Sequence, residues 1–349
     1  MGAVFSRASS FNGSLIDHRL PTFCRWSRLR FSWSRDFQRF GRVVWVSGGA
    51  VSPEATGGAG VIFEYRLAAV LLSRMLRGAH VPIGIQLPIQ RVALQQRVAG
   101  HAFDDIVVGT DTAGQGPTIE IQVKKRLSVT GGNPEFVKVM STAIEACRSH
   151  TEELKDGRLL LGLAAGDPVG DLEALAELTT MARAHPDTVS FGRLLSEGVT
   201  RASLRSRHDH VVTAVTTAAA TGSRFEAEAL THQVLSALHV WPVQVGRDGR
   251  DWRAELDLIP NLASAAGLPA DAVLGRLYDL AQEAGPRAGD LDQHMICAEL
   301  LRRYGLDLTH AVGSSPETRT TTINITNSGS GTVFSTAGNQ VFNDLRIGR

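Results

Sequence analysis

The sequence predicts an α/β fold in which a core of helix, three strands, helix and strand is followed by a mainly helical region and a short β-prone tail. Three patterns support this prediction. Residues 62–76 carry apolar side chains at helical spacing, residues 119–124 alternate between apolar and polar, and residues 159–163 form an almost continuous apolar run. These patterns are typical of an amphipathic helix, a half-buried strand and a strand buried on both faces.

The first half of the core is expected to contain one helix and three strands. The apolar stripe of Ile62–Leu76 predicts the helix. The strands are expected at Leu87–Gln96, Asp104–Val108 and Thr118–Lys124. Residues 111–117, between the second and third strands, are rich in turn-forming residues and predict a hairpin-like connection.

A second helix and a fourth strand complete the core. The helix is expected over Phe136–Cys147, with Asn133 as its N-cap and Pro134 at its first position. The strand is expected over Arg158–Ala165, where the apolar run is too continuous for a sheet with one solvated face. These elements predict a domain over residues 55–166.

The rest of the chain is expected to form a helical accessory region at residues 167–312 and a tail at residues 313–349. Breaks rich in Pro, Gly and Ser separate five candidate helices, Leu172–Ala184, Phe191–Glu197, Arg207–Ala220, Phe225–Leu238 and Ala270–Ala284. In the tail, polar and apolar residues alternate over 320–327, and a Val-Phe pair recurs at 333 and 341. Such segments are prone to cross-β stacking. The tail is therefore a candidate for self-assembly or for binding a sensor protein, with a plain hairpin or a disordered end as the alternatives.

The first 54 residues differ in composition from the rest. Residues 1–50 contain eight Arg, no Lys and three of the five Trp, without a helical or strand period and without the continuous apolar segment of a secretory signal. We expect residues 1–54 to be a disordered extension or to precede the native start, with an amphipathic targeting peptide rich in Arg and Ser as the alternative. The three cysteines lie far apart without C-x-x-C spacing, which indicates neither a disulfide framework nor a zinc site. A cytoplasmic protein without a membrane partner is the expectation.

Polar residues on two neighbouring strands form a candidate site. The alternation in the third strand places Glu120, Gln122 and Lys124 on one face. Asp105 stands at the start of the preceding strand, with Asp104 as the alternative, because adjacent strand residues face opposite ways. An acid beside an amide and an ammonium can hold a divalent cation and a phosphodiester. The alternative for the aspartate is a simple turn or strand-edge residue.

Glu64 and Lys124 each have a structural and a functional interpretation. Glu64 lies in the first turn of the first helix, where a carboxylate favours the helix dipole, yet it shares a stripe with apolar residues that face the sheet. Lys124 could be a solvated charge. However, only four of the 36 basic residues are Lys, so a Lys on the polar strand face is less expected by chance. A compact ammonium can contact one phosphate oxygen and an attacking water, whereas guanidinium favours bidentate contact.

The spacing of Asp105 and Gln122-Val123-Lys124 resembles the PD-(D/E)xK nuclease superfamily, in particular its Mrr-like branch and the double-stranded DNA endonuclease domains of bacterial antiphage defence effectors. Two flanking segments, Gly57–Tyr65 and the Pro134-Glu135-Phe136 stretch after a short loop, are similar as well. The resemblance covers under half of the chain. It implies a restriction-endonuclease-like fold acting on double-stranded DNA.

The resemblance also implies the roles of the site residues. Glu64, Asp105 and Gln122 would bind Mg²⁺ or Mn²⁺, and Lys124 would help to activate water. Because Gln122 stands where the family more often has a second acid, one ion is favoured over two. No Gly-Lys-Ser/Thr occurs, which argues against an NTPase. The alternative function is a catalytically inactive nucleic-acid-binding or scaffold protein that assembles through its C-terminal tail.

Overall fold

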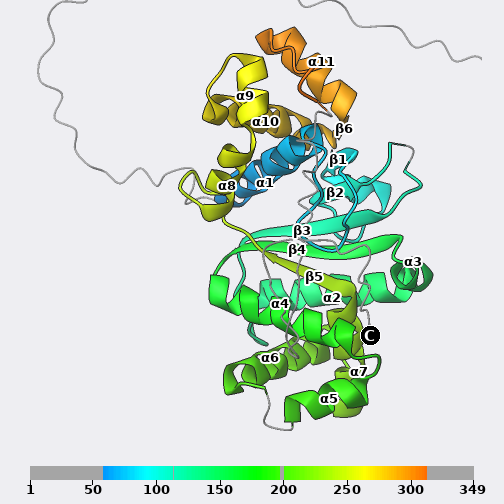
Figure 1. The fold of residues 1–349 in the computed structure, drawn as a ribbon. Coiled ribbons are helices and arrows are strands. Elements are labelled where there is room, and N and C mark those ends of the chain that lie inside the picture. The colour runs from blue at the N-terminus through cyan, green and yellow to red at the C-terminus, as the bar shows by residue number, and fades with distance from the viewer. Residues whose placement is uncertain (1–57, 113, 197–199, 313–349) are drawn as a thin grey trace, which may run out of the picture. The chain divides into compact units, whose positions relative to one another are not determined.

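A mixed sheet of six strands runs through the fold (Figure 1). The computed structural model describes residues 58–112, 114–196 and 200–312, so the predictions for the N-terminal extension and the tail lie outside the described residues. In chain order the strands are β1 (Arg91–Leu94), β2 (Ile106–Gly109), β3 (Thr118–Arg126), β4 (Leu159–Asp167), β5 (Leu238–Pro242) and β6 (Asp290–Asp292). The predicted α/β class is confirmed.

The strands lie across the sheet in the order β5-β4-β3-β2-β1-β6. β1, β2 and β3 pair antiparallel, and β6 pairs antiparallel with β1. The connection predicted between β2 and β3 joins Gly109 to Thr118, which are partners in the ladder. β3, β4 and β5 are parallel, so their carboxyl ends meet at one edge of the sheet.

Helices cover both faces of this sheet (Figure 1). One face carries α1 (Gly58–Leu76), α8 (Arg250–Leu258), α9 (Pro260–Ala266), α10 (Ala270–Ala284) and α11 (Gln293–Tyr304). The other carries α2 (Pro134–Ser149), α4 (Val169–Ala184), α5 (Thr188–Ser196), α6 (Ala202–Ala219) and α7 (Arg224–Ala237). A short helix, α3 (Thr151–Lys155), leads into β4.

Two apolar cores follow from the alternation of side chains along the strands. Ile119 and Ile121 of β3 pack in the core on the side of α1, whereas Leu161 and Leu163 of β4 pack in the core formed with α2 and α4. All but two residues of β4 are buried, as its continuous apolar run predicts. The sheet is therefore the middle of three layers, and β4 is buried along most of its length.

The predicted helices are present with shifted ends. α1 begins at Gly58, four residues before the predicted start, and α6 begins at Ala202 instead of Arg207. The predicted start of α2 is confirmed, because the side chain of Asn133 accepts a hydrogen bond of 3.0 Å from the backbone N–H of Phe136. α4, α5, α7 and α10 occupy the remaining predicted positions.

The strand predictions need two corrections. The strand expected over Leu87–Gln96 is only four residues long: it starts at Arg91 and ends at Leu94, before Gln95, whose left-handed backbone conformation with φ of 53° ends it. The helix expected to reach Leu238 ends at Ala237, and Leu238 begins β5. β5 and β6 both come from residues 167–312, so this region supplies the two edges of the same sheet and belongs to one compact unit with the core.

Candidate active site

The candidate site lies where β3 extends past the start of β2. Ile106, the first residue of β2, pairs with Ile121, so the residues of β3 from Gln122 onward have no β2 partner. Val123 is buried on the side of α1, while Gln122 and Lys124 are partly exposed on the opposite face. The start of β2 thus leaves the edge of β3 from Gln122 onward without a strand partner on that side.

Asp105, just before the start of β2, contacts the part of β3 that has no partner in β2. Its carboxylate accepts a hydrogen bond of 2.7 Å from the backbone N–H of Val123 and another from the side-chain amide of Gln122. Burial raises the pKa of Asp105, while the Val123 hydrogen bond and the charge of Lys124 act in the opposite direction. Of the two candidate aspartates, Asp105 is the one that contacts Gln122.

Glu64 reaches this site from α1 and is only 7% exposed. Its carboxylate accepts a hydrogen bond of 2.5 Å from the side-chain amide of Gln95. The pKa of Glu64 is raised to about 7, chiefly by burial and further by the negative charges of Asp105 and Asp104. The structure therefore brings together carboxylates whose mutual repulsion and desolvation a bound cation would relieve.

Gln95 is a site residue that the sequence analysis missed. Its left-handed backbone conformation is uncommon for a residue other than glycine, and such conformations cluster at functional sites. The backbone N–H groups of Gln95 and Gln96 donate to the carbonyls of Asp105 and Asp104, at 3.0 and 2.7 Å. The same turn thus holds Asp105 through its backbone and Glu64 through a side chain. No pattern in the sequence signals a left-handed glutamine.

Lys124 supplies the positive charge of the site. Its ammonium forms an ion pair of 3.4 Å with Glu135 in the first turn of α2, and its side chain is 24% exposed. The charge of Lys124 lowers the pKa of both Glu64 and Asp105, which places it within electrostatic reach of the two carboxylates. The four residues predicted from sequence are therefore neighbours, although their chemical roles stay predictions.

Glu120 shares the polar face of β3 and contacts the segment that precedes Asp104. Its buried carboxylate accepts hydrogen bonds from the backbone N–H groups of Ala102 and Phe103, at 2.8 and 3.1 Å, and contacts the Nδ1 atom of His101 at 2.7 Å. These contacts tie the segment that leads into Asp104 and Asp105 to the strand that carries Gln122. Glu120 therefore helps to set the position of Asp105.

The donor set suits a hard cation that keeps part of its water shell. Within the described residues, no group of three or more His, Cys, Asp or Glu side chains is placed to hold a metal. Glu64, Asp105 and Gln122 offer two carboxylates and one amide oxygen. Mg²⁺ is commonly bound by one or two carboxylates together with waters and substrate phosphates, so these residues fit such an ion.

Comparison with protein-family models, with curated proteins and with solved structures finds no match to this chain. Within the described ranges, no helix combines the length and the apolar character needed to cross a membrane.

Proposed function

We propose that this protein is a metal-dependent endonuclease that hydrolyses phosphodiester bonds of double-stranded DNA, as an effector in bacterial antiphage defence. The observation that supports the chemistry most is the convergence of Glu64, Asp105, Gln122 and Lys124 where β3 extends past β2. A buried carboxylate with a pKa of about 7 beside a second carboxylate is a feature of functional sites. The role in defence rests on the sequence resemblance alone.

Glu64, Asp105 and the side-chain oxygen of Gln122 would hold Mg²⁺ or Mn²⁺. When bound, the ion polarises the phosphate and lowers the pKa of a coordinated water. The amide nitrogen of Gln122 now donates to Asp105, so half a turn of the amide group is needed to present its oxygen beside the same carboxylate. Glu64 would hold the ion in its deprotonated form, since a protonated carboxyl is a poor ligand.

Lys124 acts on the phosphate and on water. Its ammonium can donate to a phosphate oxygen and offset the negative charge that develops during attack. The ion pair with Glu135 leaves two of the three ammonium protons for the substrate and the water. Val123 contributes through its backbone, because its N–H holds Asp105 in place between these groups.

The full chain should be incubated with plasmid and linear duplex DNA in the presence of Mg²⁺, Mn²⁺ or EDTA. We expect cleavage with either metal and none with EDTA. Lys124→Ala and Asp105→Ala should each abolish cleavage, Asp104→Ala should have a milder effect, and Lys155→Ala, a change of an exposed Lys in α3, is the matched control. Melting temperatures measured alongside separate lost chemistry from lost folding.

Two results would count against this proposal. Cleavage by Lys124→Ala at the wild-type rate would remove the central residue from the mechanism. Duplex binding without cleavage under any metal condition would favour the catalytically inactive nucleic-acid-binding protein. If Asp104→Ala is more severe than Asp105→Ala, the metal ligand is the other aspartate.

A further inference from the structure

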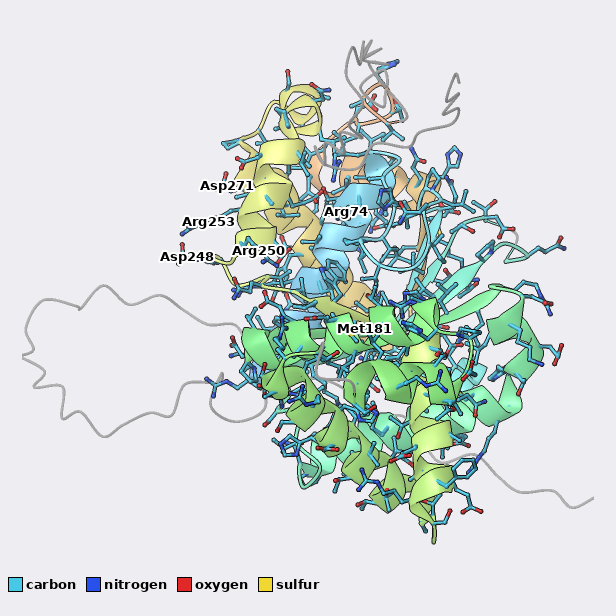
Figure 2. The ribbon with its side chains drawn as sticks, turned by 60° about the horizontal axis from the view of Figure 1, so that its bottom comes forward. Arg74, Met181, Asp248, Arg250, Arg253 and Asp271 are labelled. Carbon is cyan, nitrogen blue, oxygen red and sulfur yellow. The ribbon has the colours of Figure 1, made fainter. Side chains whose placement is uncertain are left out.

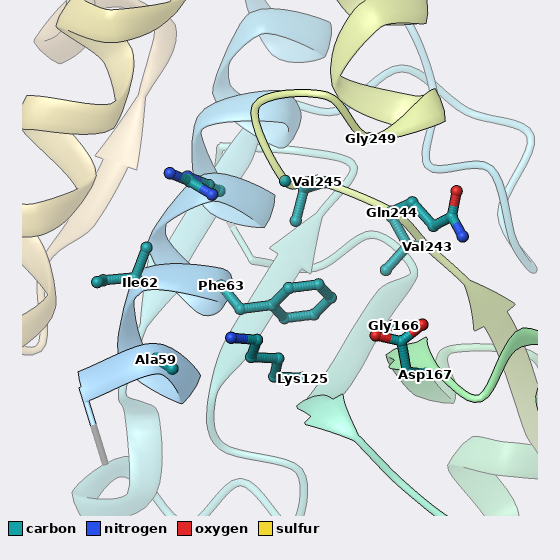
Figure 3. A pocket seen from close by; sticks show the side chains of 12 residues that line it. Ala59, Ile62, Phe63, Lys125, Gly166, Asp167, Val243, Gln244, Val245 and Gly249 are labelled. Carbon is teal, nitrogen blue, oxygen red and sulfur yellow. The ribbon is translucent and has the colours of Figure 1, made fainter. Parts of the chain in front are cut away.

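A cavity of about 290 Å³ opens at the carboxyl ends of the three parallel strands, next to the candidate active site. Ala59, Ile62, Phe63 and Arg66 line it with one face of α1, at the i, i+3, i+4 and i+7 spacing of a helix. β3 contributes Lys125, as Figure 3 shows. In open α/β sheets, ligands bind outside the carboxyl ends of the strands.

Two cations and one carboxylate define the charge of this cavity. Arg66 and Lys125 line it, and neither side chain has a hydrogen-bond or ion-pair partner among the described residues. Asp167, at the end of β4, lines the same cavity and likewise has no side-chain partner in the described part of the chain. The three side chains together carry one net positive charge. A phosphodiester, which carries one negative charge, matches this balance better than a phosphate monoester.

The far wall of the cavity is a preformed loop after β5. The side chain of Asp251 accepts from the backbone N–H of Gln244 at 2.7 Å, and the carbonyl of Gln244 accepts from the N–H of Asp251 at 3.1 Å. A Cβ atom on Gly249 would lie 2.2 Å from the carbonyl oxygen of Gln244, so only glycine fits this close approach. The loop therefore has its shape before any ligand arrives.

The outer side of this wall is also basic. Arg247, Arg250 and Arg253 are exposed there. Arg250 forms an ion pair with Asp251 at 3.3 Å, and Arg253 forms one with Asp248 at 3.2 Å. Figure 2 labels Arg250 and Arg253, which belong to α8, and Asp248, which precedes this helix. Arg247 has no ion-pair partner among the described residues, so its charge is the one at this wall that can attract a polyanion such as nucleic acid.

We propose that this cavity, named the phosphate pocket, binds one internal backbone phosphate of duplex DNA. The phosphodiester bond next to that phosphate then reaches the candidate active site. The proposal rests on the proposed function, since it assigns a subsite for the same substrate. Successive residues of β3 face opposite ways, so Lys124 serves the active site and Lys125 serves the phosphate pocket. Glu64 of the active site likewise follows directly after Phe63 of the pocket.

The test measures duplex binding by the full chain in EDTA, where cleavage does not intervene. Lys125→Ala and Arg66→Ala should each weaken binding to unrelated sequences alike. Each should also reduce the slope of log affinity against log salt concentration by roughly 0.9 in magnitude. When salt is raised from about 50 to 200 mM, the factor by which the variant loses affinity should therefore be roughly 3.5 times smaller than the factor for the wild type. Asp167→Asn removes the only negative charge of the three and should tighten binding.

Lys155→Ala is the control, because it removes an equal charge from α3, at the opposite end of β4. The proposal is overturned if the salt slopes of Lys125→Ala and Arg66→Ala equal that of Lys155→Ala. It is also overturned if Asp167→Asn binds duplex more weakly than the wild type. The substrates should include closed circular plasmid and linear duplexes with a 5′-phosphate or a 5′-hydroxyl. Effects confined to the 5′-phosphorylated duplex would show that the cavity takes a terminal phosphate and overturn the assignment to the backbone.

These outcomes are distinct from a failure of the proposed function. Suppose that the wild-type chain binds duplex through Lys125 and Arg66 but does not cleave it, whichever metal is added. This result contradicts only the endonuclease proposal. A wild-type chain that cleaves duplex while the pocket variants keep the wild-type salt slope contradicts only the phosphate pocket. A chain that binds no duplex contradicts both.

Discussion

Replacing Glu64 by Gln should stabilise the metal-free protein at alkaline pH. Burial, followed by the neighbouring aspartates, raises the pKa of Glu64 from 4.5 to about 7. Below pH 4.5 the carboxyl is protonated in both the folded and the unfolded state and imposes no penalty. As the pH rises through about 7, the folded state must carry a buried negative charge that the unfolded state accommodates in water. Each pKa unit corresponds to about 1.4 kcal/mol, so the penalty above pH 7 is about 3 kcal/mol.

Glutamine removes this charge and keeps an oxygen that can accept from Gln95. In urea unfolding with EDTA, the free energy of unfolding of Glu64→Gln should therefore exceed that of the wild type by about 3 kcal/mol at pH 8.5, and by less than about 1 kcal/mol at pH 5. Mg²⁺ should raise the stability of the wild type at pH 8.5 more than that of the variant. Glu145→Gln, on the exposed side of α2, is the control.

An equal effect of Glu64→Gln at the two pH values would refute the reasoning, because it would show that Glu64 titrates alike in the folded and unfolded states. A variant less stable than the wild type at pH 8.5 would show that the carboxylate is stabilised by its surroundings rather than penalised.

Three further variants test the fold by urea unfolding. Glu255→Ala should lower the free energy of unfolding by about 3 kcal/mol, because this residue is 1% exposed and its loss leaves Arg74 and Arg77 without the carboxylate that both contact. A decrease of less than about 1 kcal/mol would contradict this prediction. Asn133→Ala should cost about 1 kcal/mol through the lost N-cap of α2, and an unchanged midpoint would argue against that cap. Gly166→Ala should lower the free energy of unfolding by about 1–3 kcal/mol, since the added Cβ atom would lie 2.7 Å from the carbonyl oxygen of Lys125. An unchanged stability would mean that β3 and β4 separate easily at this point.

The grouping of the site residues could be predicted because period-two alternation is a local property. Once residues 118–124 form a strand, Gln122 and Lys124 must share a face, and an antiparallel neighbour that begins near Asp105 must bring it close. The structure places the Asp105 carboxylate on Gln122. The stripe that Glu64 shares with Ala68 and Leu71 indicated burial as one of two interpretations, and all three residues are buried.

Other features depend on contacts between distant segments and leave no local signal. β5 follows α7 without a break and ends at Pro242, so its five residues resemble the last turn of the helix before them. β6 has three residues, too few for an alternation to be recognised. The left-handed conformation of Gln95 and the phosphate pocket both arise where chain segments meet, and neither could be predicted from composition or spacing.

Because both outer strands of the sheet come late in the chain, the order of synthesis matters. When residues 58–167 have left the ribosome, β1 and β4 each expose a row of unpaired backbone N–H and C=O groups. β6 emerges roughly 125 residues later, which at about 5–20 residues per second is roughly 6–25 seconds of translation. β5 can cover the edge of β4 after roughly 75 residues, but the edge of β1 stays open to pairing with another nascent chain through the whole interval. A chaperone that shields strand edges would therefore be needed most by polysomes, where many copies of this intermediate are held close together.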